Sequence, residues 1–285
     1  MQYKTVVVIF LILVLSIEIN ATENKDSTKV FGWFPSVKSA LNISQISLKD
    51  WSQGGSNSLT WVFTLFSGLD YKGETWHFRN NLKLAYGRTK LGEEDFKTND
   101  NELYLESIVS RKIGWAIDPF FSNTVRTAIS EGYSYKKLPP TKIANFFDPG
   151  YLTQSLGFTY DGKKVFKTRL GIAVQEVFTN EYRQYSDDKS TKDKVEAFKL
   201  ETGFESVTDT EIKVDKNLSY KAGLRLFSRF ESLDVWDIRW DNLVTAKVNS
   251  YVNVSLNFLI VYEKAQSYKT QMKQTLLLGL SYTII

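Results

Sequence analysis

A single histidine limits the catalytic chemistry that this chain can perform. His77 is the only histidine among 285 residues, and the chain has no cysteine. A multi-histidine metal site, a cysteine-based metal site and thiol chemistry are therefore excluded. A Ser–His–carboxylate site would have to use His77. We predict no catalytic residue, no metal site and no cofactor, and we keep a hydrolase that uses His77 as an alternative.

Charged residues recur at every second position of several segments. In Trp76–Tyr86, Arg79 and Lys83 lie on one face, and Phe78 and Leu82 lie on the other. This period of two predicts a strand with one polar and one apolar face. On neighbouring strands acid lies beside base, which permits two interpretations. One is a ladder of ion pairs that fills a narrow lumen, and the other is the constriction of an ion- or solute-selective pore. The candidate lumen-lining residues are His77, Arg79, Lys83, Glu102, Glu106, Lys199, Glu201, Glu205, Lys221, Arg225, Arg229, Asp237, Arg239 and Asp241.

An aromatic and basic segment forms a second candidate site. It lies within Glu131–Gly150, which the Pro139-Pro140 pair and Asp148-Pro149-Gly150 predict to be the longest irregular loop. It is either an ordered loop packed into a barrel mouth or a contact surface for lipopolysaccharide phosphates or a partner protein. The candidate contact residues are Tyr133, Tyr135, Lys136, Lys137, Phe146 and Phe147. A net charge of +4 is too small to indicate nucleic-acid binding.

The strands that must position these residues are clearest in Ser58–Gly87. Two alternating runs meet at a tight polar turn, Tyr71–Glu74, and predict a β-hairpin. Each arm is about twice the usual ~5–6 residues, with aromatic rings at both ends of its apolar face. Long strands with aromatic ends are typical of hairpins that cross a membrane. We expect Trp61, Phe63, Trp76, Phe78, Leu82 and Leu84 to face lipid, and Arg79, Asn81 and Lys83 to face the lumen.

The connections between about twelve predicted strands alternate in length. Short turns are expected at Tyr71–Glu74, Lys112–Gly114, Asp161–Lys164, Asp209–Glu211 and near Ser250. The others are longer and hydrophilic, and include Arg88–Asp100, Glu131–Gly150 and Glu181–Lys194. Short turns on one side, long loops on the other and an even strand count predict a closed antiparallel transmembrane β-barrel. The short turns would be periplasmic and the long loops extracellular.

The boundaries of individual strands follow from the same pattern. We expect a first strand at Val37–Asp50, a strand at Trp115–Ser130, and a pair at Val195–Val207 and Ile212–Phe230. The chain ends in an apolar strand, Gln271–Ile285, that should pair with the first strand, because no open sheet edge can face lipid.

The N-terminus indicates export. A basic start precedes an apolar run that is too short for a comfortable membrane helix, and Ala21 supplies a small residue near a cleavage site. We predict a signal peptide at residues 1–21, a flexible mature N-terminus at 22–36 and an outer-membrane barrel at 37–285.

Two short motifs carry a resemblance to a known family. They are Trp51-Ser52-Gln53-Gly54-Gly55, and Asn145–Tyr151 followed by Leu156-Gly157-Phe158-Thr159-Tyr160. The chain resembles Bacteroidota envelope proteins that are known only as a domain of unknown function. The resemblance covers most of the mature chain and implies an exported outer-membrane barrel. It implies no activity and no catalytic residues.

The function expected from the sequence is therefore structural or transport. We predict a small pore, or an accessory barrel in a larger envelope assembly, in contact with outer-membrane lipid. The alternatives are an outer-membrane hydrolase using His77 and a soluble periplasmic β-protein.

Overall fold

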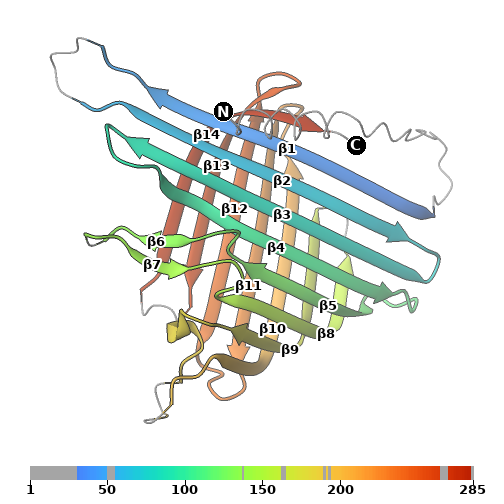
Figure 1. Cartoon of the computed structure of the whole chain (residues 1–285). Helices are drawn as coiled ribbons and strands as arrows, with labels where there is room; N and C mark the ends of the chain where they lie inside the picture. The colour runs from blue at the N-terminus through green and yellow to red at the C-terminus, as the bar shows by residue number, and fades with distance from the viewer. Residues whose placement is uncertain are drawn as a thin grey trace. The chain divides into compact units, whose positions relative to one another are not determined.

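Twelve long antiparallel strands form a closed barrel (Figure 1) in the computed structural model, which describes residues 31–49, 55–136, 138–161, 165–188, 191, 194–263 and 269–283. The predicted signal peptide, residues 1–21, lies outside these ranges, as does most of 22–36. The barrel strands are β1 (Gly32–Ile46), β2 (Ser58–Lys72), β3 (Trp76–Leu91), β4 (Lys97–Arg111), β5 (Asp118–Thr127), β8 (Gly150–Asp161), β9 (Phe166–Phe178), β10 (Phe198–Lys213), β11 (Leu218–Arg229), β12 (Trp236–Lys247), β13 (Val252–Tyr262) and β14 (Gln271–Thr283).

Each barrel strand pairs with its neighbours in sequence, and β14 pairs with β1. The predicted pairing of the last strand with the first is thus confirmed, and so are the fold class and the strand number. Two shorter strands, β6 (Gly132–Ser134) and β7 (Thr141–Ala144), form a separate hairpin between β5 and β8, and η1 (Arg183–Tyr185) is a single 3-10 turn. None of the helical segments in the described ranges is long and apolar enough to cross a membrane.

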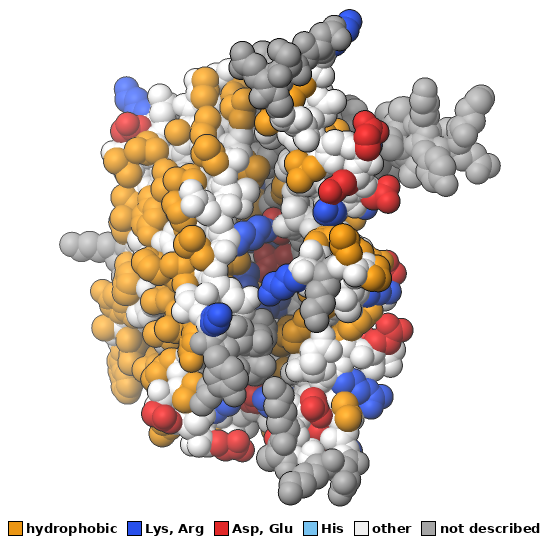
Figure 2. Space-filling view, turned by 90° about the vertical axis from the view of Figure 1, so that its left-hand side faces the viewer, with side chains coloured by type: hydrophobic (Ala, Val, Ile, Leu, Met, Phe, Trp, Pro, Cys, Tyr) orange, Lys and Arg blue, Asp and Glu red, His pale blue; other side chains and the backbone are white. Residues whose placement is uncertain are grey.

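Side chains alternate between an apolar outer wall and a polar interior. Large apolar residues such as Phe63, Trp76, Phe78, Leu156 and Leu276 are exposed on the outside. In Figure 2 hydrophobic side chains cover the wall on the left, while acidic and basic side chains are visible in the central hollow. A water-soluble protein does not normally expose so large an apolar surface. The wall therefore favours a lipid-facing barrel over the soluble alternative.

The connections segregate as predicted. Residues 73–75, 112–117, 162–165, 214–217 and 248–251 join strands at one end, which we call the short-turn end. The longest connections, 47–57, 128–149 and 179–197, lie at the opposite, long-loop end. Because β1 begins opposite Lys72, the N-terminal side of β1 lies at the short-turn end.

The predicted loop Arg88–Asp100 is wrong in extent. β3 continues to Leu91 and β4 begins at Lys97, so only residues 92–96 connect them. β3 and β4 remain paired along this stretch because a β-bulge between Gly87 and Arg88 accommodates the shift in register. Charge alone suggested a loop here, yet charged side chains are compatible with a strand that extends beyond the membrane.

The predicted turn at Asp209–Glu211 is also wrong. β10 runs through these residues to Lys213, and the turn lies at 214–217. The Asp215 Oδ1 accepts hydrogen bonds from the backbone N–H groups of Asn217 and Leu218, at 2.6 and 2.8 Å. This Asx turn reverses the chain, whereas Asp209 points into the barrel.

Three further boundaries differ. The barrel begins at Gly32, five residues before the predicted start at Val37, and β1 ends at Ile46 rather than Asp50. Within the predicted strand Trp115–Ser130, the observed strand β5 spans only Asp118–Thr127. The predicted irregular segment Glu131–Gly150 contains β6 and β7, which pair around the Pro139-Pro140 turn.

Candidate functional site

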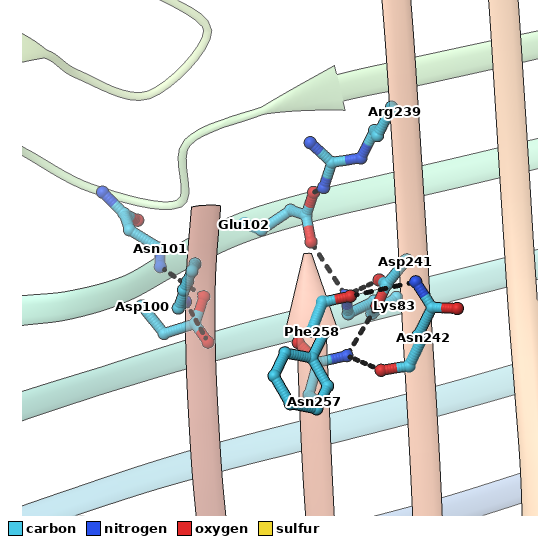
Figure 3. Close-up of polar contacts among 10 residues, drawn as sticks. Lys83, Asp100, Asn101, Glu102, Arg239, Asp241, Asn242, Asn257 and Phe258 are labelled. Carbon is cyan, nitrogen blue, oxygen red and sulfur yellow. Dashed lines mark hydrogen bonds and ion pairs between the residues drawn. The ribbon is translucent and has the colours of Figure 1, made fainter. Parts of the chain in front are cut away.

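A cluster of four charged side chains crosses the interior of the barrel. Lys83 on β3, Glu102 on β4, and Arg239 and Asp241 on β12 point inward because their positions alternate with the lipid-facing residues of each strand (Figure 3). Arg239 Nη2 donates to Glu102 Oε1 at 2.6 Å, and Lys83 Nζ donates to Glu102 Oε2 at 2.9 Å. Asp241 lies 3.9 Å from the same ammonium. We call these four residues the lumen cluster.

The lumen cluster joins opposite walls. In the order of strands around the barrel, β4 and β12 are six positions apart in either direction. The pair between Glu102 and Arg239 therefore spans the bore and does not follow the sheet. Two other pairs also connect distant walls: Arg126 of β5 with Glu263 after β13, at 3.9 Å, and Lys273 of β14 with Asp100 of β4, at 2.9 Å.

The side-chain amide of Asn257 holds Asp241 of the cluster in place. Asn257 Nδ2 on β13 donates to Asp241 Oδ1 at 2.5 Å and to the backbone carbonyl oxygen of Asn242 at 3.2 Å (Figure 3). Glu102 and Arg239 are largely shielded from solvent. Charge-assisted hydrogen bonds of this kind are strong, and losing one partner leaves the other charge desolvated.

Cavities lie around the lumen cluster. One of about 640 Å³ extends toward the short turns and is bordered by Lys83 and Asp241. Another, of about 340 Å³, is bordered by all four cluster residues and by Ala128, Ala144 and Pro149 of the β5–β8 connection. A smaller one of about 230 Å³ lies between the cluster and the β4–β9 wall. Residues of the cluster therefore border all three cavities.

A second network lies along the half of the wall that runs from β4 through β5, β8, β9 and β10 to β11. Arg169 Nη2 donates to Glu106 Oε1 at 2.6 Å. Arg225 donates to Glu205 at 2.6 Å and to Gln175 at 3.0 Å. Ser155 also donates to Glu205. This network stays on one side of the bore and satisfies buried charges, as the salt-bridge interpretation required.

A third group lies at the long-loop end. Arg229 bridges Glu201 and Asp237, each at 2.7 Å, and Lys199 donates to Glu201 at 2.6 Å. The guanidinium groups of Arg225 and Arg229 both lie over the Phe227 ring, at 5.4 and 5.7 Å from its centroid. The ring and the carboxylates together hold both guanidinium groups in place.

The other predicted lumen residues lie as follows. Arg79 lies 3.7 Å from Asp161, and Lys221 lies 3.0 Å from Glu211; both basic residues border the 640 Å³ cavity. His77 is the second residue of β3, beside the short turn, and its Nε2 is buried without a hydrogen-bond partner among the described residues. No serine hydroxyl or carboxylate in those residues is bonded to the ring, so the geometry of the hydrolase alternative is not assembled there.

The aromatic and basic segment within Glu131–Gly150 does not fill the bore. The β6–β7 hairpin projects from the barrel strands at the left of Figure 1. Tyr135 accepts a hydrogen bond from the Thr98 N–H of β4 at 3.1 Å and lies under the Lys97 ammonium, while Tyr133 packs against Tyr135. Lys136 is among the described residues, whereas Lys137 lies outside them.

At the base of this connection, aromatic rings continue onto the outer wall. Phe146 packs on Phe147, Phe147 on Phe178, and Phe178 on Phe198, with centroids 5.2 to 6.3 Å apart. Asn101 Oδ1 accepts from the N–H groups of Ile129 and Ser130, which anchors the start of the connection to β4.

Sequence reasoning missed several lumen residues. Tyr104, Arg126, Arg169, Asp100 and Lys273 line cavities or form ion pairs there. Tyr104 alternates with Glu102 and Glu106, so the same period of two could have found it. In the described part of the chain, no group of three or more histidine or acidic residues could hold a metal ion.

A family model matches residues 43–133 of the chain, and that family is described as a protein of unknown function, DUF3078. The match fits the expected resemblance to an unknown-function family. It contains the first quoted motif, most of which lies outside the described residues, and does not extend to the second. No curated protein matches the sequence.

Solved structures with a similar arrangement include outer-membrane barrels. The translocator domain of the autotransporter NalP from Neisseria meningitidis has 10% identity and a TM-score of 0.40, over 90% of both chains. An outer-membrane channel from Pseudomonas putida F1 has 10% identity and a TM-score of 0.40, over 92% of this chain and 99% of that one. A refined porin has 6% identity and a TM-score of 0.35, over 88% and 100%. The barrel assignment itself rests on the strand pairing of this chain.

Proposed function

We propose that this protein is an outer-membrane pore for small ions or polar solutes whose axial path is closed by the lumen cluster. The observation that carries the proposal is the pair between Glu102 and Arg239, which spans opposite walls inside the lumen cluster. The pair borders the cavity of about 340 Å³, and Lys83 and Asp241 of the same cluster also border the cavity of about 640 Å³. A polar bore inside an apolar wall provides a path for solutes that lipid excludes.

The apolar wall and the predicted export signal support a location in the outer membrane. Closed barrels leave no backbone edge exposed to lipid and are the form in which strands span membranes. Aromatic residues lie at both ends of the apolar wall: Trp33, Tyr71 and Trp76 near the short turns, Phe178 and Trp236 near the long loops. We place the short turns in the periplasm and the long loops outside the cell.

For the pore to open, the ion pairs of the lumen cluster must break. Glu102 holds both Arg239 and Lys83, so it is the acceptor on which the closure depends. Once the charge of Glu102 is removed, the cations Arg239 and Lys83 remain at the level of the lumen cluster. We therefore expect the open path to favour anions, since rings of basic side chains select anions.

Planar-bilayer recording of the purified protein tests this function. Glu102→Gln is expected to raise the frequency or size of single-channel openings severalfold and to shift selectivity toward anions. The matched control is Glu106→Gln on the same face of β4, because Glu106 pairs with Arg169 without crossing the bore. If neither the wild type nor Glu102→Gln carries current, the pore function is wrong.

A second function is favoured by the exposed apolar residues beside the bore. At the turn of the β6–β7 hairpin Leu138 is 92% exposed, and Phe146 is 61% exposed. We propose that this surface contacts an envelope partner, whether lipopolysaccharide or a larger outer-membrane protein, so that the barrel acts as an accessory subunit. Leu138→Ser with Phe146→Ser should then reduce co-purification of a membrane partner. Unchanged co-purification would contradict the accessory function.

A further inference from the structure

The seam between the first and last strands is only partly paired. β1 pairs with β2 over fifteen residue pairs, from Gly32–Lys72 to Ile46–Ser58. β1 pairs with β14 over five, from Lys38–Thr283 to Asn42–Gly279. Both strands continue beyond the last of these pairs toward the long loops, so the barrel wall is unpaired there within the described residues.

Strand length does not explain the gap. Continuing the register would place Ile43 opposite Leu278 and Ile46 opposite Thr275, and all four residues lie in strands. β14 instead keeps its pairing with β13 up to Gln271, while β1 stays with β2. Unpaired backbone N–H and C=O groups cost several kcal/mol each in hydrocarbon. A partly open seam in a lipid-facing wall therefore indicates a place where something passes or binds.

The interior reaches this seam from both strands. The 640 Å³ cavity is bordered by Ala40 and Asn42 of β1, which are among the residues of β1 paired with β14, and by Thr275 and Leu277 of β14, which lie beyond the last pair. Met272 of β14 is 68% exposed and faces lipid by alternation, yet it borders a cavity of about 300 Å³ with the lumen residue Arg126. An outward-facing residue of β14 thus lies at the border of an interior cavity.

The larger cavity has one uncharged and one charged side. Near the seam the apolar Ala40, Val62, Phe66 and Leu277 border it together with uncharged polar residues such as Asn42, Thr64 and Thr275, whereas Lys167 and Asp209 on β9 and β10 border it across the bore. In the described part of the chain no ion pair or hydrogen bond engages the Lys167 ammonium. A volume of this size lies within the ~300–1,000 Å³ of small-molecule sites.

The geometry points to a lateral opening between β1 and β14 through which a single-chain amphiphile with an anionic head group enters the lumen from the membrane. Its acyl chain lies along Val62, Phe66 and Leu277 near the seam, and its head group binds Lys167. This route does not require the lumen cluster to separate, because the cavity on the short-turn side reaches the seam directly.

A reversible cross-link tests the route. The chain has no cysteine, so Ile43→Cys with Leu278→Cys can be bridged by a short bis-methanethiosulfonate reagent and released by dithiothreitol. The control is Leu41→Cys with Phe63→Cys, which are register partners in the fully paired β1–β2 ladder. Palmitate in lipid nanodiscs is the probe, and native mass spectrometry measures its loading. The seam cross-link is expected to slow loading at least tenfold and its reduction to restore it, while the control cross-link has no effect.

A second pair of variants tests the head-group site. Lys167→Met is expected to weaken palmitate binding about tenfold. Lys221→Met should change it little, because Lys221 borders the same cavity but is paired with Glu211. Equal loading with the seam cross-linked and released, or no palmitate on the released protein, would overturn the lateral route. Channel current is measured separately, so failure of the pore leaves this test intact.

Discussion

At the residue scale, Phe227 shows how the polar interior of the barrel depends on an apolar side chain. It is fully buried at 0% exposure on the lumen face of β11, between Arg225 and Arg229. Both guanidinium groups lie near its ring, and each is also paired with a carboxylate. The ring fills space that the two arginines would otherwise leave empty, and it keeps them oriented toward Glu205 and Glu201.

Phe227→Ala should therefore lower the free energy of unfolding by about 3–5 kcal/mol, because it removes a buried ring and leaves a cavity. Urea unfolding of the protein in liposomes measures this loss. Leu226→Ala on the neighbouring lipid-facing position is the control and should cost clearly less, since lipid fills the space. Equal losses in the two variants would show that Phe227 does not organise the arginines.

At the scale of elements, turns decide where strands end. The β10–β11 turn lies where Asp215 satisfies two backbone N–H groups, six residues after Asp209. Local side-chain chemistry thus determines the reversal, since a strand tolerates an inward-facing aspartate when the lumen is polar.

Asp215→Ala is expected to destabilise the folded barrel by about 1 kcal/mol, the usual net contribution of such hydrogen bonds. The same urea titration measures it. Asp209→Asn, at the position where the sequence suggested a turn, should leave stability nearly unchanged. A larger loss from Asp209→Asn than from Asp215→Ala would contradict the observed turn.

The β6–β7 hairpin gives a prediction for pH. Lys142 and the Tyr133 hydroxyl donate to Glu131 at 2.7 and 2.6 Å, and these hydrogen bonds lower the pKa of the Glu131 carboxyl. A lowered carboxyl pKa stabilises the hairpin above the ordinary pKa of glutamate, and the contribution is lost as pH falls through the lowered value.

Amide hydrogen exchange of the hairpin, corrected for the intrinsic pH dependence, should therefore show more opening at acidic pH than at neutral pH. Glu131→Gln removes the titrating carboxyl and should abolish this difference. A wild-type hairpin whose protection is the same at both pH values would contradict the role of the pair.

At the scale of the whole molecule, the two faces of each strand meet different environments. Leu82 lies opposite Leu105 on the outer wall, and the adjacent Lys83 belongs to the lumen cluster. Two adjacent residues of β3 thus face lipid and the polar interior, respectively.

Leu82→Lys should cost about 2–4 kcal/mol if the position lies near the middle of the bilayer. Lys83→Ala should instead alter channel conductance, because it removes one of the two cations held by Glu102. Folding yield into liposomes and bilayer conductance distinguish the two effects. Identical folding defects in both variants would mean that the faces of β3 are assigned incorrectly.

The sequence by itself determined the barrel, its strand number and the two kinds of connection. These properties are local, because a period of two separates lipid-facing from lumen-facing residues within each strand. The bounds of loops such as Arg88–Asp100 could not be predicted, because charged residues occur both in loops and in strand ends that extend beyond the membrane.

Only the tertiary structure decided which charges meet. Glu102 and Arg239 are 137 residues apart and lie on strands that are not neighbours, so no pairing rule between adjacent strands connects them. Their contact depends on the curvature and stagger with which the sheet closes. The same closure decides how far β1 and β14 pair, since the strands at the seam must accommodate the register accumulated around the whole barrel.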